Sequence, residues 1–196
     1  MNRDIRHTRA FKTDIQTREE NKNLEIAGYF AIFDSETELF PGAFEKLSRS
    51  AFDNQLDADV RALINHDTTL VLGRTKSNTL KLEVDERGLY GTIQINPNDT
   101  DALNIYERVK RGDVDQCSFG FYIREEETEF DEAGNTHWTI KDLDLYEVSV
   151  CTFPAYQDTG VEAREKQFKD LEERKLKNIK MRLKERLQDV KSNNAE

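Results

Sequence analysis

The chain has 196 residues, of which 36% are hydrophobic and 35% are charged, and its formal net charge is −10. This length favours one principal domain with an appended segment, and the negative charge argues against nucleic-acid binding, which needs clustered Lys and Arg. No apolar run approaches the roughly 20 residues that span a bilayer, and the N-terminus lacks the apolar region of a signal peptide. We therefore expect a soluble cytoplasmic protein that binds neither nucleic acid nor membrane.

The first third of the chain moves from a polar segment to apolar ones. Residues 1–23 are polar and mixed in charge without a sustained period, which predicts a loose N-terminal arm. The nearly continuous apolar run at 24–33 predicts a buried strand. After a turn-like Pro-Gly-Ala, apolar residues at 44, 47 and 51 recur at helical spacing and predict a short helix.

Strand patterns dominate the middle of the chain. Residues 59–67 predict a strand whose alternation places four side chains on one face; these are Val60, Ala62, Ile64 and His66. A second apolar strand follows at 70–73. Residues 79–95 contain two alternating runs around a polar turn with Gly88, which predicts a hairpin.

A helix and further strands complete the predicted domain. Asp99 or Thr100 can cap a helix that stops at Gly112, and strands are expected at 117–123 and within 136–153. Many short strands with only two short helices predict a compact, mostly-β or α+β barrel. We place this domain at residues 24–160.

Residues 161–196 form a segment rich in Glu, Lys, Arg and Leu that contains neither proline nor glycine. Its apolar residues step by three and four, which predicts an amphipathic C-terminal helix; they are Leu176, Ile179, Leu183, Leu187 and Val190. This helix can dock on its own domain, or it can bind a partner or another copy of the chain, because the stripe is narrow and the other faces are charged.

The two cysteines, Cys117 and Cys151, lie in apolar strand-like runs and not in a metal-ligand spacing. A cytoplasmic protein rarely carries a structural disulfide, so we interpret both as small core residues. With only three histidines, scattered along the chain, a zinc site is not expected. We predict no metal and no cofactor.

His66 is the best candidate for a general base. It ends an apolar strand and precedes Asp67, where a rigid element can present a side chain to a cleft. His7 lies in the predicted arm, and His137 follows a hairpin turn, where solvent is the expected neighbour. A histidine at the end of a strand is more often structural than catalytic, so this position alone does not identify a site.

Ser118 is the candidate nucleophile, which a serine hydrolase pairs with a base and an orienting group. Alternation places Cys117 and Phe119 on one face, and Ser118 with Gly120 on the other. Gly120 leaves room for a substrate backbone beside the hydroxyl. The plain alternative is an ordinary polar residue on a half-buried strand. The surrounding residues are not a G-x-S-x-G elbow, so an α/β-hydrolase is not supported.

Glu147 lies in an apolar run at a position where alternation predicts an inward side chain. A buried carboxylate is costly unless it is paired, which makes an imidazole a plausible partner. The alternatives are a solvated edge-strand glutamate or a structural salt bridge.

The order of these motifs resembles the prohead serine proteases of tailed bacteriophages over residues 24–156. The resemblance is carried by GYFAIFDS at 28–35, PGAF at 41–44, NHD at 65–67, a D-x-x-GLY hairpin, G-D-x-x-x-C-SFGF, L-x-EVS and a closing PA. It implies that His66 is the base, Ser118 the nucleophile and Glu147 the third member, with Asp144 and Asp142 as alternatives.

The resemblance also implies a fold and a biology. That family is related in fold to the herpesvirus assemblins, so a closed β-barrel ringed by helices is expected. The activity implied is a serine endopeptidase that cleaves scaffold segments of the major capsid protein, and its own flanks, within the immature capsid in the host cytoplasm. The rival hypothesis is a catalytically silent assembly protein with the same fold.

Overall fold

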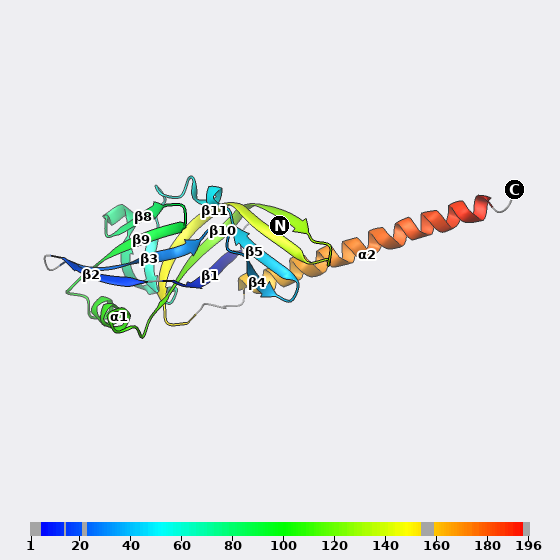
Figure 1. The fold of residues 1–196 in the computed structure, drawn as a ribbon. Coiled ribbons are helices and arrows are strands. Elements are labelled where there is room, and N and C mark those ends of the chain that lie inside the picture. The colour runs from blue at the N-terminus through cyan, green and yellow to red at the C-terminus, as the bar shows by residue number, and fades with distance from the viewer. Residues whose placement is uncertain (1–4, 14, 21–22, 154–158, 194–196) are drawn as a thin grey trace.

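The computed structural model of the chain describes residues 5–13, 15–20, 23–153 and 159–193 (Figure 1). A seven-stranded sheet contains β1 (Arg6–Lys12), β4 (Thr37–Phe40), β5 (Ala43–Leu47), β6 (Arg61–Ile64), β7 (Asp67–Arg74), β10 (Gln116–Phe130) and β11 (Thr136–Cys151). A four-stranded sheet contains β2 (Gln16–Glu20), β3 (Asn23–Ile32), β8 (Leu80–Val84) and β9 (Gly88–Ile95). The helices are α1 (Thr100–Arg111) and α2 (Thr159–Asn193), and 3-10 turns cover η1 (Arg49–Phe52) and η2 (Thr75–Ser77).

The mostly-β fold class is confirmed, but the prediction of a closed barrel is wrong. In the described residues, no strand of one sheet pairs with a strand of the other. The long strand β11 is the reason that the larger sheet branches. Its first part pairs in parallel with β5 and its last part pairs in parallel with β6, while β10 lies antiparallel along its other side.

Apolar side chains of both sheets and of α1 form one core. Phe119 and Phe121 of β10 stack with ring centroids 4.7 Å apart, and Phe52 of η1 lies 5.9 Å from Phe119. All three rings are fully buried. Burial of a side chain of this size stabilises the fold by about 1.5–3 kcal/mol, so this cluster firmly anchors the strand that carries Ser118.

Two local predictions are confirmed. Residues 80–95 form the expected hairpin of β8 and β9. Helix α1 begins after Asp99, whose carboxylate accepts hydrogen bonds from the backbone N–H groups of Asp101 and Ala102. The helix ends at Gly112, which has a φ of +85° in the left-handed region that glycine adopts without strain.

Two other predictions are not met. The expected helix around residues 44–51 is instead strand β5 followed by η1, because Ala43, Glu45 and Leu47 alternate toward the interior with period two. The segment at 1–23 is also not a loose arm where it is described. Strand β1 pairs with β10, and β2 pairs with β3.

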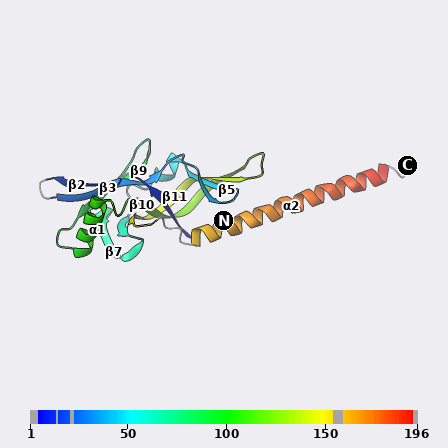
Figure 2. The ribbon, with the colours of Figure 1, turned by 60° about the horizontal axis from the view of Figure 1, so that its bottom comes forward.

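Helix α2 projects away from the two sheets for most of its length (Figures 1 and 2). Its beginning is nevertheless part of the folded body. Arg164 is 1% exposed and forms ion pairs with Glu45 and Glu126, and Phe168 packs edge-on against Phe40 with ring centroids 5.4 Å apart. The predicted boundary at residue 161 therefore lies before two side chains, Arg164 and Phe168, that pack against the strands.

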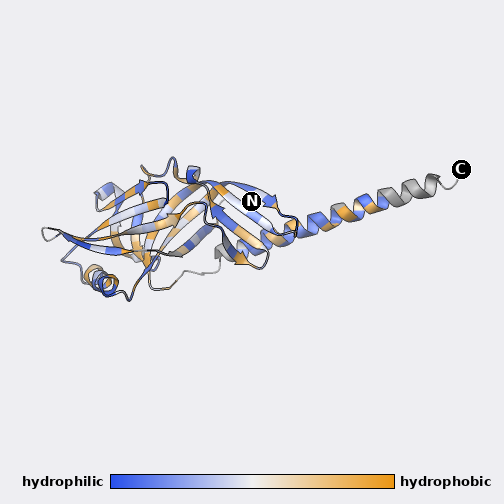
Figure 3. Cartoon of the chain, viewed as in Figure 1, coloured by the Kyte–Doolittle hydropathy of each residue, from blue (hydrophilic) through white to orange (hydrophobic). Residues whose placement is uncertain are grey.

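The outer part of α2 carries the predicted apolar stripe in solvent. Leu176, Ile179 and Leu183 are each more than half exposed, and Figure 3 shows isolated hydrophobic residues along an otherwise hydrophilic helix. Leu187 and Val190 lie outside the residues whose side chains are described. Within the described part of the chain, no helix is both long and apolar enough to cross a membrane.

Candidate active site

His66 lies in the two-residue turn between β6 and β7, two residues beyond the end of the strand in which the sequence places it. Asn65 and His66 both have positive φ, of 50° and 62°, as in the type I′ turns of tight hairpins. A histidine rarely adopts this conformation, so the turn needs outside support. The N–H of Asn65 donates to the carbonyl of Val150 at 3.0 Å, and the N–H of Thr152 donates to Asn65 Oδ1 at 2.9 Å.

Glu147 of β11 faces the imidazole of His66. Its Oε1 lies 2.7 Å from His66 Nδ1, and its side chain is 1% exposed. Because a carboxylate accepts hydrogen bonds, Nδ1 of His66 donates to Oε1, and Nε2 is the ring nitrogen that faces away from Glu147. The second carboxylate oxygen, Oε2, accepts a hydrogen bond from Ser149 Oγ at 2.6 Å.

Ser118 of β10 is fully buried, and its hydroxyl donates to the carbonyl of Arg9 in β1 at 2.8 Å. The nucleophile candidate therefore bonds to the neighbouring edge strand and not to His66. This hydroxyl must break its bond to the Arg9 carbonyl before it can give its proton to an imidazole.

The strand register brings the candidate residues to one face of the sheet. Ser118 lies directly opposite Ser149, and Gly120 lies directly opposite Glu147. Opposed residues of neighbouring strands share a face, so Ser118 and Glu147 project to the same side. The His66 ring lies on that side too, because it contacts Glu147. Ser118 and His66 do not come from adjacent strands, because β11 runs between β10 and β6.

Gly120 supplies the space that Glu147 occupies. A Cβ added at Gly120 would overlap Glu147 Oε1. We expected the space beside Gly120 to receive a substrate backbone. The carboxylate that contacts His66 occupies this space instead.

Cys151 contacts the other nitrogen of the imidazole: its Sγ lies within hydrogen-bond distance of His66 Nε2, at 3.8 Å. Burial raises the pKa of the Cys151 thiol to about 12, and the charge of Glu147 adds to this effect. Burial also raises the pKa of Cys117 to about 12. The thiolate is the nucleophilic form of cysteine, so neither residue competes with Ser118 for the role of nucleophile. Both are buried and unpaired, as expected of core cysteines.

The alternative acids lie elsewhere. Asp144 forms an ion pair with Arg124 and is half exposed, and Asp142 opposes Glu125 farther along the hairpin. The other two histidines have different partners. His7 stacks on Phe121 in the interior, and His137 hydrogen-bonds Glu36 at 2.8 Å near the surface. Only Glu147 joins His66 among the acids that the sequence offered.

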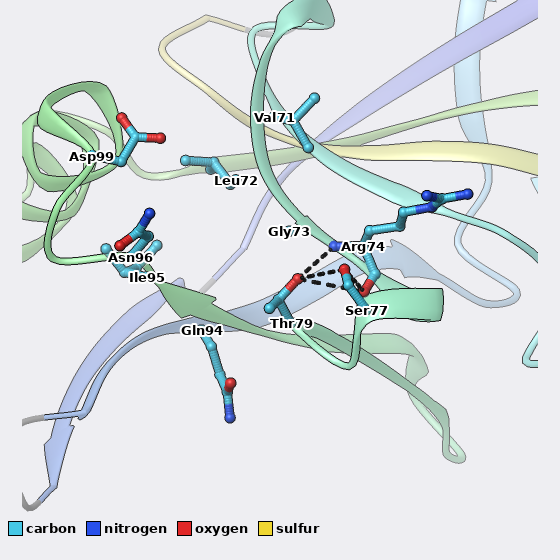
Figure 4. Close-up of a pocket in the computed structure, with 10 residues that line it drawn as sticks. All are labelled: Val71, Leu72, Gly73, Arg74, Ser77, Thr79, Gln94, Ile95, Asn96 and Asp99. Carbon is cyan, nitrogen blue, oxygen red and sulfur yellow. Dashed lines mark hydrogen bonds between the residues drawn. The ribbon is translucent and has the colours of Figure 1, made fainter.

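A cavity of about 420 Å³ lies next to β7, between η2, the end of β9 and the first turn of α1 (Figure 4). Its charged groups already have partners. The guanidinium of Arg74 donates two hydrogen bonds of 2.6 Å to Asp59, and Asp99 caps α1. Thr79 and Ser77 bond to each other and to the backbone of Arg74. We assign no chemistry to this cavity.

Sequence reasoning missed Ser149 and Cys151 as neighbours of His66. Alternation does place both on the face of Glu147, and that signal was visible. What it does not show is that the turn after β6 folds back over β11. The closing PA motif at 154–155 lies outside the described residues.

Comparison with known proteins gives a consistent result. A family model described as caudovirus prohead serine protease matches residues 11–174. The chain is 31% identical over 157 residues to the prohead protease of Enterobacteria phage HK97, covering 78% of this chain and 65% of that protein. It is 30% identical over 155 residues to the prohead protease of Escherichia phage T5, covering 78% and 69%. It thus spans about two thirds of the length of these relatives.

A solved structure, that of the bacteriophage T4 capsid assembly protease, aligns with 74% of this chain and 98% of its own. The sequence identity is 8% and the TM-score is 0.42. A likeness of this size carries no argument about the site.

Proposed function

The chain belongs to the caudovirus prohead serine protease family, and from this premise we propose that it is a serine endopeptidase of capsid maturation. The observation that carries the proposal is the 2.7 Å contact between His66 Nδ1 and Glu147 Oε1, on the face of the sheet to which Ser118 projects. These three residues supply a base, its orienting acid and a hydroxyl, which is the set that acyl transfer needs.

The proposed reaction has two halves. Nε2 of His66 takes the proton of the Ser118 hydroxyl as Oγ bonds to the carbonyl carbon of the peptide. The same proton then passes to the leaving nitrogen as the C–N bond breaks, which leaves an acyl-enzyme. Water attacks the ester in the same way, and Ser118 regains its proton. Glu147 stabilises the imidazolium that forms in each half.

The proposed substrates are scaffold segments of the major capsid protein and the flanks of this chain, cleaved inside the immature shell in the host cytoplasm. Family membership supports this assignment. The proposal extends to α2 as the segment that recruits the protein, through binding to the capsid protein or its scaffold region or through self-association. Seven of the thirteen residues at 174–186 are Lys or Arg and one is acidic, within a chain of net charge −10. An acidic partner surface is therefore favoured.

A second candidate is a silent assembly protein with the same fold. The observation in its favour is that Ser118 is fully buried and bonded to Arg9. The pair formed by His66 and Glu147 argues for the protease, because a buried carboxylate–imidazole pair is costly to bury and a purely structural protein gains little stability from it.

The decisive experiment is co-expression with the coat protein of the same phage, with fragment termini read by mass spectrometry. The wild-type chain is expected to shorten itself and to cut the coat protein, and Ser118→Ala is expected to stop both. Fragments that persist at the same termini in Ser118→Ala would assign the cleavage to another protease. An intact wild-type chain with intact coat protein would favour the silent assembly protein.

A further inference from the structure

Ser149 bonds to both partners of the pair formed by His66 and Glu147. Its Oγ donates to Glu147 Oε2 at 2.6 Å and accepts from the backbone N–H of His66 at 3.2 Å. The residue is fully buried, so water does not replace either bond. A second hydrogen-bond donor stabilises the buried carboxylate of Glu147, and a fixed acceptor stabilises the positive-φ turn at His66.

We propose that Ser149 is a positioning residue that fixes the carboxylate plane of Glu147 and the backbone of His66 together. With Oε2 bonded to Ser149, Oε1 points at Nδ1, which keeps the imidazole proton on Nδ1 and leaves Nε2 to accept the proton of Ser118. With its N–H bonded to the same hydroxyl, His66 holds its positive φ of 62°. One hydroxyl thereby sets the tautomer and the place of the ring. The inference rests on the proposed function for its catalytic meaning.

The first measurement concerns the imidazole and needs no activity. The hydrogen-bonded Nδ1 proton of His66 is expected as a slowly exchanging downfield proton signal, assigned by its loss in His66→Gln. Ser149→Ala is expected to broaden or remove the signal, and Ser149→Thr, which keeps the hydroxyl, to retain it. Melting curves show whether each variant is folded. An unchanged signal in folded Ser149→Ala overturns the proposal, whether or not the chain is a protease.

The second measurement uses a fluorescent fluorophosphonate. In this reaction Ser118 Oγ bonds to phosphorus, fluoride leaves and His66 takes the hydroxyl proton. Ser149→Ala is expected to slow labelling about 10- to 100-fold, the effect of a lost hydrogen bond to a charged group, while Ser149→Thr restores most of the rate. In a Glu147→Gln background, Ser149→Ala is expected to add less than about threefold, because the two act as a unit. Equal losses in both backgrounds overturn the proposal. No labelling of wild type at Ser118 counts against the proposed function instead.

A different observation concerns access to Ser118. Strand β1 is an edge strand whose seven residues pair with 116–122 of β10, and Ala10 lies directly opposite Ser118. Together with the bond from Ser118 to the Arg9 carbonyl, this pairing leaves the hydroxyl without exposed surface. Strand β1, an extended segment of the protein itself, therefore already occupies the position beside Ser118.

Charged side chains hold β1 there. Arg9 Nε donates to Glu45 at 2.6 Å, and Glu45 is also paired with Arg164 of α2 at 2.7 Å. His7 stacks on Phe121 with centroids 5.6 Å apart. The strand is thus clamped between the core and the first turns of α2, with the three groups Arg9, Glu45 and Arg164 as the clamp.

We infer that substrate reaches Ser118 by taking the place of β1 as an extended strand on the β10 edge. Removal of β1 would free those backbone N–H and C=O groups of residues 116–122 that point toward β1, while the others stay bonded to β11. A free edge of this kind is what extended peptides recognise by strand addition. The ligand class is therefore an unfolded polypeptide segment of at least several residues. This inference also rests on the proposed function.

A disulfide that joins β1 to β10 and can be reduced again tests the inference. Cysteines replacing the opposed residues Arg6 and Tyr122 lie within disulfide reach on neighbouring strands. Oxidised protein is expected to label with the fluorophosphonate at least about tenfold more slowly than the same protein after reduction. Arg9→Ala, which removes one arm of the clamp, is expected to label faster than wild type. Both single-cysteine variants serve as controls for the redox treatment.

The outcomes separate the two ideas. Equal labelling of locked and reduced protein means that β1 need not move, and this overturns the inference while leaving the protease intact. Labelling in Arg9→Ala that exceeds wild type supports it. If folded wild type, reduced lock and Arg9→Ala all fail to label at Ser118, the proposed function fails and the inference falls with it.

Discussion

Glu147 has one carboxylate oxygen on His66, the other on Ser149, and almost no surface in solvent. In the proposed protease, its charge orients the imidazole and stabilises the imidazolium but makes no bond to substrate. Glu147→Gln is therefore expected to lower kcat roughly 10²- to 10⁴-fold, short of the complete loss in Ser118→Ala. Peptide hydrolysis by the two purified variants measures the difference. Normal turnover in Glu147→Gln would remove the acid from the mechanism.

The sequence pointed to His66, Glu147 and Ser118 but not to their arrangement. Strand alternation placed Glu147 inward and Ser118 opposite the aromatic face, and the ladder of β10 with β11 has that pattern. The turn at His66 could not be predicted, because a positive φ at a histidine arises from tertiary bonds to β11 and not from local preference. Ser149 was hidden for a similar reason: a serine on a strand has no signal of its own until its partners are known.

Strand β5 and strand β1 show why two elements were misjudged. Both carry charged or polar residues in the interior, since Glu45, Arg9 and His7 are all nearly buried. The pattern of apolar and polar residues predicts that such side chains lie on the surface. Burial alone would raise the pKa of Glu45, but the charges of Arg9 and Arg164 outweigh it and lower the pKa to about 2. Ion pairs that join β1, β5 and α2 take the place of apolar contacts here, and only apolar contacts leave a periodic pattern in the sequence.

Acid is expected to loosen β1 first. Burial, reinforced by the charges of Arg9 and Arg164, lowers the pKa of His7 from 6.5 to about 4. The unfolded chain therefore binds a proton before the folded one, so this contribution to stability is complete above pH 6.5 and falls as pH drops from 6.5 to 4. The loss is on the order of 3 kcal/mol. Glu45 adds a further loss between its ordinary pKa of 4.5 and about 2.

Urea unfolding at a series of pH values checks this expectation. His7→Gln removes the titrating group and is expected to flatten the free energy of unfolding between pH 6.5 and 4. His137, which lies near the surface and is 23% exposed, is the matched control. Its hydrogen bond with Glu36 raises its pKa, so it stabilises the fold at low pH and loses that effect as pH rises. A His7→Gln profile as steep as wild type would show that other groups cause the acid loss.

Two truncations of α2 are expected to distinguish the stability contributed by its first turns from that contributed by its outer part. A chain that ends at residue 161 lacks Arg164 and leaves Glu45 and Glu126 without that partner. Breaking a buried pair costs about 3–5 kcal/mol, which corresponds to a loss in Tm of roughly 10 °C for a chain of this size. A chain that ends at residue 175 keeps Arg164 and Phe168 and is expected to melt close to the full-length protein. Equal melting of both would place the whole helix outside the folded body.

At the scale of the whole molecule, charge is unevenly distributed. The outer part of α2 is basic and carries exposed Leu176, Ile179 and Leu183, while the chain as a whole is acidic. In the proposed function this segment recruits a partner. Association is then expected to need both charge and the apolar stripe, and to weaken at high ionic strength, where the Debye length falls from about 10 Å at 0.1 M to about 3 Å at 1 M.

Sedimentation of the full chain, alone and with the coat protein of the same phage, measures this association. Ile179→Asp with Leu183→Asp is expected to weaken it at least about tenfold, since two apolar contacts of about 1 kcal/mol or more are lost. Met181→Asp is the matched control, because Met181 is equally exposed but lies on the opposite side of the helix from Ile179. Equal weakening by both changes would indicate a charge effect alone.

The bond between Ser118 and the Arg9 carbonyl joins residues 109 positions apart, and this separation orders events during synthesis. The ribosome makes β1 first, so the strand that covers the hydroxyl exists before the hydroxyl does. Arg164, the last member of the clamp, emerges after every strand of both sheets. The contacts of Arg164 that hold β1 over Ser118 are therefore the last to form. In the folded protein, Ser118 becomes exposed only when β1 moves away from β10.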